Sequence, residues 1–288
     1  RKQGGKVNMK TIAVLNFKGG VGKTVTTATL AYLLAKQGKR ILLIDGDSQG
    51  NLSMSFGIDA EEGADTLALL TEGAGYYPEF VTPTIFDGID LIPSDINLLV
   101  ADRHMAQSGV GRMQRAIADL RDAIEEDADQ DNAYDLILID CPPALGLLTV
   151  NGLVAADQLI IPMLAEFYAL EGLSQLTNTI KVVRSNYNPN LDIGGILFVM
   201  FDQRLNVSRQ VEEEVKKYFP NKVFQTKIPR NVRLSEAPSH GKPVMYYDRF
   251  SKGAEAYMLL GLELLGEKPP EKKRRLLSFG KKRESGDQ

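Results

Sequence analysis

The segment from Lys18 to Thr24 restricts the possible folds more than any other part of this sequence. It reads Lys-Gly-Gly-Val-Gly-Lys-Thr and joins an apolar run at Thr11–Asn16 to a helical pattern at Gly22–Gln37. Glycine at three of four successive positions lets the backbone curl so that several N–H groups face one point. That point lies at the start of a helix, where the partial positive charge favours an anion. The order strand, glycine-rich turn, helix therefore predicts a phosphate-binding loop.

The residues of this loop have predicted roles in nucleotide binding. Lys23 would reach the β- and γ-phosphates, and the Thr24 hydroxyl would bind Mg²⁺. A glycine-rich turn alone can be purely structural, but the Lys-Thr pair at the start of the helix favours a nucleotide. The predicted nucleotide contacts are Lys18, Gly19, Gly20, Val21, Gly22, Lys23, Thr24 and Val25.

Short apolar runs and helical patterns alternate along the rest of the chain. Most of the runs lack polar alternation, as expected of strands that are covered on both faces. This order predicts an α/β fold with a mainly parallel, twisted sheet flanked by helices on both faces. The predicted strands are Thr11–Asn16, Arg40–Asp45, Ile89–Pro93, Tyr134–Asp140, Gln158–Pro162, Gly194–Phe201 and Val223–Ile228. The predicted helices are Gly22–Gln37, Gly111–Glu126, Glu171–Tyr187, Val207–Phe219 and Lys252–Leu265.

The composition excludes several classes of protein. The 288 residues are 43% apolar and 25% charged, as in an ordinary globular protein with one sizeable core. Cys141 is the single cysteine, and His104 and His240 stand far apart in sequence, which excludes an internal disulfide and a Cys/His zinc site. No apolar run approaches the roughly 20 residues of a membrane-spanning helix. The basic first residues lack the apolar stretch of a signal peptide, so we expect a cytoplasmic protein.

Three aspartates are candidates for the chemistry at the phosphates. Asp140 ends an apolar strand, and a carboxylate at that end of a parallel strand points into the crevice where ligands bind. It is the candidate for holding Mg²⁺ through the water shell. Asp45 and Asp47 follow another strand and should point to the same side. The alternatives are a cap of the following turn for Asp140 and an Asx-type turn for the other two.

The loop resembles the deviant Walker A motif of the ParA/MinD group of P-loop ATPases. Lys18 corresponds to the signature lysine of that group, and the resemblance implies that it reaches across a sandwich homodimer to the partner's phosphates. The segment Asp45–Asn51 resembles the group's Asp-x-Asp-Pro-Gln-Gly, with Ser48 in place of the usual proline. Val25 likewise stands where a second threonine is common. The resemblance implies ATP and Mg²⁺ as cofactors, with Asp47 orienting the attacking water and Asp45 supporting the metal shell. Alternatively, Lys18 is an ordinary surface lysine.

A second segment, Lys227–Pro243, resembles the ParA/Soj branch of the group. The resemblance implies that Pro229 and Asn231 contact adenine. It also implies that nearby basic residues bind DNA phosphates without sequence preference, which makes the binding sensitive to salt. It further implies slow intrinsic ATP hydrolysis, a ParB-like activating partner and association with the nucleoid. The DNA-binding candidates are Arg204, Arg230, Arg233, Lys242 and Lys252.

The likeness extends from about Lys10 to Leu265 and divides the chain into three parts. Residues 1–8 are read as an N-terminal extension or a remnant of cloning, 9–266 as the ATPase domain, and 267–288 as a basic, disordered tail. The tail carries eight Lys and Arg against four Asp and Glu. A solvated tail, an auxiliary DNA contact and a membrane contact therefore stay open. The alternative function is a MinD-like, membrane-associated regulator of position in the cell. A reductase like the nitrogenase iron protein is disfavoured because one cysteine cannot supply a shared cluster.

Overall fold

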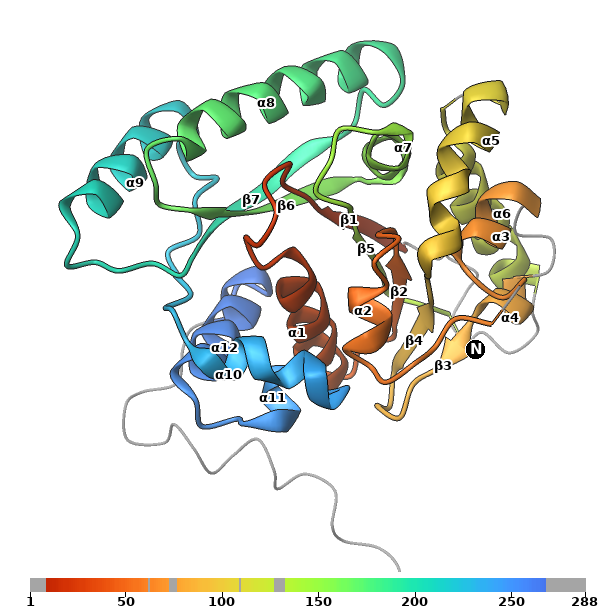
Figure 1. The fold of residues 1–288 in the computed structure, drawn as a ribbon, viewed down its shortest axis with the longest axis horizontal. Coiled ribbons are helices and arrows are strands. Elements are labelled where there is room, and N and C mark those ends of the chain that lie inside the picture. The colour runs from red at the N-terminus through yellow and green to blue at the C-terminus, as the bar shows by residue number, and fades with distance from the viewer. Residues whose placement is uncertain (1–8, 62, 73–76, 109, 127–132, 268–288) are drawn as a thin grey trace, which may run out of the picture.

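The computed structural model describes residues 9–61, 63–72, 77–108, 110–126 and 133–267, and their core is one twisted sheet between two layers of helices (Figure 1). The seven-stranded sheet of this described part has the order β3-β4-β2-β5-β1-β6-β7. Only β3, which pairs with β4, is antiparallel; the other pairs are parallel, which confirms the predicted α/β fold. The strands are β1 (Lys10–Val14), β2 (Ile41–Asp45), β3 (Thr82–Pro83), β4 (Ile89–Ile92), β5 (Leu136–Asp140), β6 (Gln158–Leu164) and β7 (Asp192–Val199).

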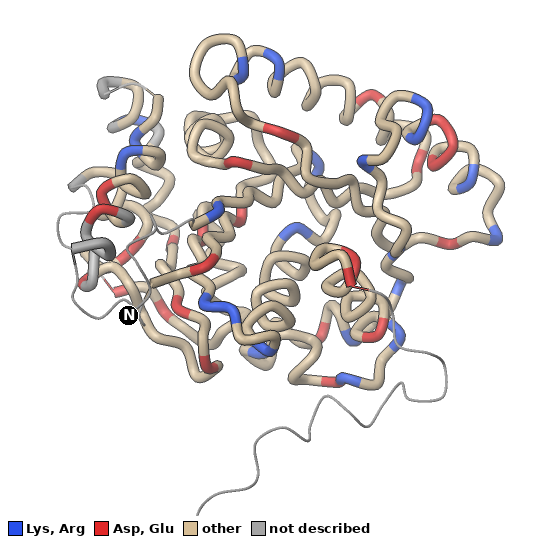
Figure 2. Tube along the Cα trace, turned by 180° about the vertical axis from the view of Figure 1, so that it is seen from behind, with Lys and Arg blue, Asp and Glu red and all other residues tan. Residues whose placement is uncertain are grey.

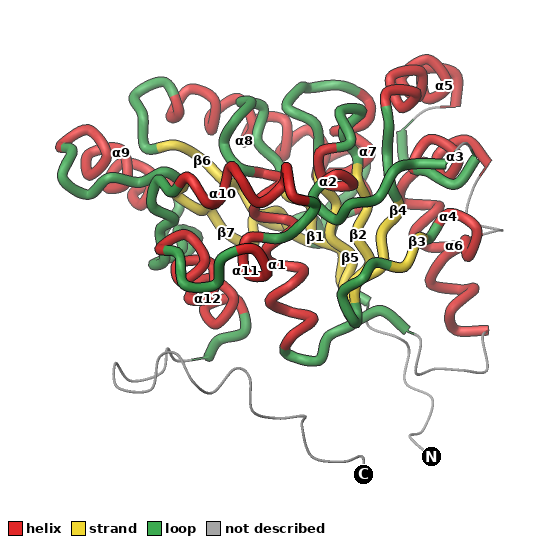
Figure 3. The backbone as a smooth tube through the Cα atoms, turned by 60° about the horizontal axis from the view of Figure 1, so that its bottom comes forward, coloured by secondary structure: helices red, strands yellow, loops and turns green. Residues whose placement is uncertain are grey.

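Helices cover both faces of the sheet (Figures 1 and 3). One layer consists of α1 (Lys23–Lys36), α2 (Asn51–Met54), α10 (Val232–Glu236), α11 (Val244–Tyr247) and α12 (Lys252–Leu264). The other consists of α3 (Thr66–Glu72), α4 (Tyr77–Phe80), α5 (Ala101–Ser108), α6 (Arg112–Glu126), α7 (Leu147–Ala155), α8 (Ala169–Asn186) and α9 (Asn206–Tyr218). The 3₁₀ helices η2 (Ile96–Val100) and η4 (Ala237–His240) precede α5 and α11.

The sheet separates two apolar cores, one under each helical layer. Along β2, Ile41 and Leu43 pack with the α1 layer, whereas Leu42 and Ile44 pack with the opposite layer. Successive side chains of a strand point to opposite faces, so a strand buried on both sides must be apolar throughout. The unbroken apolar runs of the sequence are therefore the central strands.

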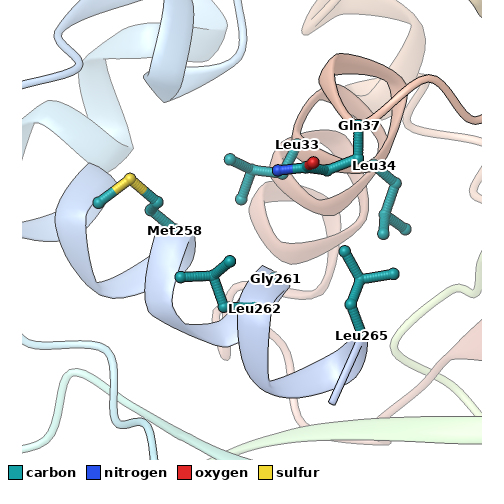
Figure 4. Close-up of a pocket in the computed structure, with 7 residues that line it drawn as sticks. All are labelled: Leu33, Leu34, Gln37, Met258, Gly261, Leu262 and Leu265. Carbon is teal, nitrogen blue, oxygen red and sulfur yellow. The ribbon is translucent and has the colours of Figure 1, made fainter. Parts of the chain in front are cut away.

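Helix α12 fixes the position of α1 by packing along it (Figure 4). Leu33 and Leu34 of α1 face Met258, Gly261 and Leu262 of α12 around a recess of about 10 Å³. A space of that size holds one water at most, so this contact is packing and not a ligand site. Within the described residues, no helix has the length and apolar character needed to cross a bilayer.

The predicted strand Val223–Ile228 is wrong. Its ends do bond to β7, because the N–H groups of Phe224 and Ile228 donate to β7 carbonyls at 3.0 and 2.9 Å. Between them, the next two N–H groups after Phe224 donate to the Glu263 carboxylate of α12, at 2.6 and 2.9 Å. A carboxylate of α12 thus accepts two N–H groups in the middle of this segment, and the bonds to β7 lie at the two ends of the segment.

Candidate functional site

The sheet brings two predicted acidic residues together at its carboxyl edge. In the β2–β5 register Asp45 lies beside Asp140, and in the β1–β5 register Asp140 lies beside Val14. The phosphate loop leaves β1 directly after Val14, so it starts beside both carboxylates. Gly46 is needed at this point, because a Cβ there would lie 2.7 Å from the Asp140 carbonyl oxygen.

The backbone of the loop has the shape expected of an anion-binding turn. Gly20 and Gly22 have φ angles of +71° and +73°, a region that side chains disfavour. Gly22 is the N-cap of α1 and offers no side-chain cap, so the N–H groups of the first turn stay available. Free N–H groups at a helix start attract an anion, which suits the predicted phosphate contacts.

Thr24 and Asp140 lie in direct contact, as the prediction of a shared Mg²⁺ site requires. The Thr24 hydroxyl donates to one carboxylate oxygen of Asp140 at 2.6 Å, and the Thr27 hydroxyl donates to the other at 3.2 Å. Burial, reinforced by the neighbouring Asp45, raises the pKa of Asp140 to about 8. Thr27 was not predicted to take part in the site. Its position four residues after Lys23 was the available signal, because residues at that spacing lie on the same face of a helix.

Lys23 is buried among the carboxylates. Its Nζ donates to the Lys18 carbonyl oxygen at 3.3 Å. Burial lowers the pKa of the ammonium, while Asp140 and Asp47 act against that change. Asp45, Asp47 and Asp140 are all buried, and two of them, Asp140 and Asp47, act electrostatically on the Lys23 ammonium. Hard oxygen ligands with excess negative charge fit Mg²⁺, and Thr24 and Asp140 are the residues that would hold it.

Asp45 organises the loop that carries Asp47. One carboxylate oxygen of Asp45 accepts the backbone N–H and the hydroxyl of Ser53, at 2.8 and 2.7 Å. The other accepts the Asp47 N–H at 3.2 Å. Burial raises the pKa of Asp45 to about 6, although the Ser53 donors oppose it. Both Asp45 oxygens thus bond to its own loop, so a part in the metal shell stays a prediction.

Asp47 forms the Asx-type turn considered as an alternative, because its Oδ1 accepts the Gln49 N–H at 3.1 Å. Its backbone is also held: the Ser94 hydroxyl donates to the Asp47 carbonyl oxygen at 2.9 Å. Ser94 in turn donates its N–H to the Ser53 hydroxyl at 3.1 Å. Sequence reasoning missed both serines. Ser94 could have been predicted from its position directly after the predicted strand Ile89–Pro93, since strand ends of a parallel sheet gather at one edge.

Lys18 lies at the exposed side of the loop. Its Nζ forms an ion pair with Glu166, after β6, at 2.7 Å. Its N–H donates to the Asn16 side chain at 3.0 Å. Gly19 has open space on the same side, since an added Cβ would meet only Pro143, at 4.0 Å.

The adenine candidates begin the segment that leads to α10. Asn231 caps this helix, because its Oδ1 accepts the Arg233 N–H at 2.9 Å. The following residues pack on α1, and Val25 lines a recess of about 10 Å³ together with Leu234 and Pro238. Pro229 and Asn231 are both half-buried beside this packing.

The DNA-binding candidates lie outside the phosphate loop, between the end of β7 and the start of α12. Along the backbone trace, Lys and Arg are interspersed with Asp and Glu (Figure 2). Arg204 pairs with Asp202, and Arg233 pairs with Glu236 and Asp248. The Lys242 ammonium lies 5.4 Å from the centre of the Tyr246 ring. Within the described part of the chain, Arg230 and Lys252 form no ion pair. The structure thus does not gather the predicted cations into one uniformly positive patch.

The comparisons with known proteins agree with this geometry. Residues 9–193 match a family described as an AAA domain. The sporulation initiation inhibitor protein Soj of Bacillus subtilis is 46% identical over 258 residues, covering 88% of this chain and 98% of Soj. The chromosome partitioning protein ParA of Myxococcus xanthus is 45% identical, covering 92% of this chain and 91% of ParA.

The chain belongs to the Soj/ParA family. The resemblance predicted from Lys18–Thr24 and Lys227–Pro243 is confirmed. Among solved structures, the cobyrinic acid a,c-diamide synthase of Mycobacterium smegmatis with bound ATP analogue and magnesium is 33% identical, with a TM-score of 0.74. That alignment covers 89% of this chain and 94% of the synthase. Membership of the Soj/ParA family and the likeness to a nucleotide complex both agree with the phosphate loop described above.

Proposed function

We propose that this member of the Soj/ParA family is an ATP-dependent switch. In this proposal two copies close around two ATP–Mg²⁺ units, and the closed dimer binds DNA without sequence preference. Hydrolysis, stimulated by a ParB-like partner, releases the DNA and so drives segregation of DNA or positioning of a cargo. The observation that carries the proposal is a set of exposed apolar side chains, called the rim here, which follow the strands at the edge of the sheet that also carries the phosphate loop.

This rim comes from the loops and helices, among them α2, η2 and α9, that follow five parallel strands. The carboxyl ends of parallel strands meet at one edge of a sheet, which here is the edge of the phosphate loop. Phe167 and Tyr168 are 73% and 77% exposed and contact each other edge to face. Exposed apolar groups that gather on one face favour a protein interface. The rim consists of Met54 after β2, Ile96, Leu99 and Val100 after β4, Leu145 after β5, Phe167 and Tyr168 after β6, and Met200, Leu205 and Val207 after β7.

The buried groups supply the chemistry of the proposed site. Lys23 and the loop N–H groups would hold the phosphates, and Thr24 and Asp140 would hold Mg²⁺, which would supply positive charge against the charge of the phosphates. The Asp47 carboxylate would accept a hydrogen bond from the attacking water and so orient it. Phosphoryl transfer depends mainly on positioning and charge stabilisation, so a loop fixed by Asp45, Ser53 and Ser94 suits this role.

Lys18 is the group that joins the two subunits. Its ion pair with Glu166 is exposed, and surface pairs contribute only about 0–1 kcal/mol, so the lysine can leave Glu166 at little cost. In the closed dimer it would reach the phosphates of the other subunit, as an arginine finger does in other nucleotide hydrolases.

The dimer is tested by light scattering after gel filtration, with Mg²⁺ and a non-hydrolysable ATP analogue. We expect the wild type to dimerise and Lys18→Ala to stay monomeric while still binding the analogue. Lys39→Ala is the matched control, because Lys39 is 47% exposed in a single ion pair with Asp135, against 46% for Lys18. A wild-type protein that stays monomeric with bound analogue would overturn the proposal.

The DNA interaction is tested by retention on duplex DNA at moderate salt with and without ATP. We expect retention that depends on ATP and that Arg233→Glu abolishes. Flotation with anionic vesicles separates the MinD-like alternative, whose mark is ATP-dependent lipid binding that is lost on deleting Lys272–Gln288. That segment lies outside the described residues. ATP-dependent flotation without DNA retention would replace the proposed function by the alternative.

A further inference from the structure

One arginine of the candidate DNA surface is already bound to a carboxylate of its own chain. The candidate DNA surface consists of Arg204, Arg230, Arg233, Lys242 and Lys252. Arg204 Nε donates to Asp202 Oδ1 at 2.9 Å, and Nη2 donates to Oδ2 at 2.6 Å. Two parallel N–H···O bonds are the arrangement in which a guanidinium also binds phosphate. Asp202 therefore occupies one of the two edges with which the Arg204 guanidinium can bind a DNA phosphate, the edge formed by Nε and Nη2.

A second arginine, Arg233, is paired with two carboxylates. Arg233 Nη1 lies 2.7 Å from a Glu236 oxygen, and Nε lies 3.3 Å from Asp248. The Tyr247 hydroxyl also donates to Glu236, at 3.4 Å, which steadies that carboxylate. The Arg233 guanidinium is thus shared by two carboxylates, one at the end of α10 and one after α11.

The two arginines belong to neighbouring segments at the exposed surface. The Phe201 N–H donates to the Ile228 carbonyl oxygen at 2.9 Å, so the loop carrying Arg204 runs beside the segment that leads to Arg233. The Arg204 side chain is 85% exposed. Arg204 also holds the pKa of Asp202 down, at about 2, so the carboxylate stays ionised at neutral pH.

We propose that Asp202 and Glu236 are in-chain competitors for DNA phosphate, which weaken DNA binding at Arg204 and Arg233. The inference rests on the proposed DNA binding and concerns its strength. A phosphate must displace the carboxylate or share the guanidinium with it. Because exposed pairs are weak, the exchange is possible, but the displaced carboxylate remains close and repels the DNA. The surface therefore binds DNA loosely enough to release it.

The competition also changes the expected salt dependence. DNA binding releases about 0.9 counter-ion for each phosphate that a protein cation neutralises. An arginine that is already neutralised by its own chain contributes less than this. The salt dependence of the wild type should therefore be weaker than its number of basic residues implies, and removal of a competing carboxylate should strengthen it.

The test compares Asp202→Asn with Glu214→Gln. Asparagine keeps an Oδ1 that can accept the Arg204 N–H, a bond of 3.0 Å in the wild type, so the turn is preserved. Glu214 is the matched control, because it is 36% exposed in one ion pair with Lys217, against 33% for Asp202, and its substitution changes the net charge equally. Duplex affinity is measured by fluorescence anisotropy over a salt series, with protein, Mg²⁺ and a non-hydrolysable ATP analogue.

We expect Asp202→Asn to bind duplex about 2- to 5-fold more tightly, the range of a surface ion pair. Its slope of log affinity against log salt should steepen by up to about 0.9. Glu236→Gln should act in the same direction through Arg233, whereas Glu214→Gln should change affinity less than about 2-fold. In an Arg204→Ala background the gain from Asp202→Asn should shrink, because the two residues act as a pair.

The possible failures are distinguishable. If the wild type binds duplex but Asp202→Asn binds no more tightly than Glu214→Gln, the inference is wrong and the proposed function stands. An undiminished gain in the Arg204→Ala background would also overturn it, since the effect would then be general charge. If the wild type with analogue binds no duplex at any salt, the proposed function itself fails.

Discussion

The phosphate site and the candidate DNA surface differ in the burial and the bonding of their charged side chains. Asp45 and Asp140 are buried, and each accepts hydrogen bonds from at least two groups. Arg204 is exposed, and its side chain is held by a single aspartate two residues away. A buried charge must be paired because its desolvation is costly, whereas an exposed one can exchange partners with water or ligand.

The difference indicates a division of tasks between the two regions. A buried, cross-linked set of carboxylates fixes atoms in place, which phosphoryl transfer requires. A surface of weakly paired cations gives contacts that form and break, which binding without sequence preference requires. Substitutions in the first region should therefore have large effects on turnover or stability, whereas those in the second should change the stability of the fold only slightly. The predictions below test this contrast in order of expected size.

The largest effect should follow from Asp47→Ala. If Asp47 orients the attacking water as proposed, its loss should lower ATP turnover about 10²- to 10⁴-fold, while the analogue-bound dimer still forms. Steady-state hydrolysis and light scattering on the same preparation measure the two properties. Asp59→Ala, at an exposed aspartate further along the same segment, is the control and should hydrolyse ATP normally. Normal turnover by Asp47→Ala would remove Asp47 from the site.

The next effect is a pH-dependent gain in stability from Asp140→Asn in protein free of nucleotide and Mg²⁺. The folded pKa of Asp140, about 8, lies above the unfolded value of about 3.9, so between these values the folded state binds the proton more tightly. Wild-type stability is therefore lowered as pH rises toward 8, and asparagine avoids this loss. The unfolding temperature of Asp140→Asn minus that of the wild type should therefore increase from pH 5 to pH 8.

Asp192→Asn is the control for that pH series. Lys222 holds the pKa of Asp192 below its usual value, so its contribution is favourable and constant above pH 5. Its substitution should lower the unfolding temperature by an amount that does not vary from pH 5 to pH 8. A pH-independent difference for Asp140→Asn as well would show that burial does not control the protonation of Asp140.

A smaller effect is expected from Ser53→Ala. The change removes one donor to Asp45 and leaves the buried Ser94 N–H without its acceptor. An unsatisfied buried donor costs about 1–3 kcal/mol of unfolding free energy, measured by denaturant unfolding. Ser185→Ala, at an exposed position of α8, should change it by less than about 0.5 kcal/mol. Equal values for the two variants would mean that the Ser53–Ser94 link does not hold the loop.

The sequence predicted the central sheet and the phosphate loop because both depend on local pattern. Unbroken apolar runs marked β1, β2 and β5, and glycine spacing marked the turn before α1. The neighbouring positions of Asp45 and Asp140 at the ends of β2 and β5 agree with the predicted crevice at the carboxyl ends of parallel strands.

Sequence reasoning failed where the local structure depends on a distant residue or on a side-chain rotamer. Glu263 takes the N–H groups after Phe224 and so ends the predicted strand, but no local pattern indicates this partner. Ser94 reaches the Asp47 backbone from the end of β4, which depends on the three-dimensional position of two loops. Asp202 lies two residues from Arg204, but pattern reasoning gives no side-chain rotamer and so did not predict their ion pair.

The smallest effect should be that of Arg204→Ala on folding. The side chain is almost fully exposed, and its bonds to Asp202 compete with water, so the unfolding free energy should change by less than about 0.5 kcal/mol. For a chain of this size, that corresponds to a shift of roughly 1–2 °C in unfolding temperature. A loss as large as that of Ser53→Ala would show that Arg204 holds its loop in place. Any defect in DNA binding would then follow from altered structure, and the contrast between a fixed site and an exchangeable surface would not apply to this arginine.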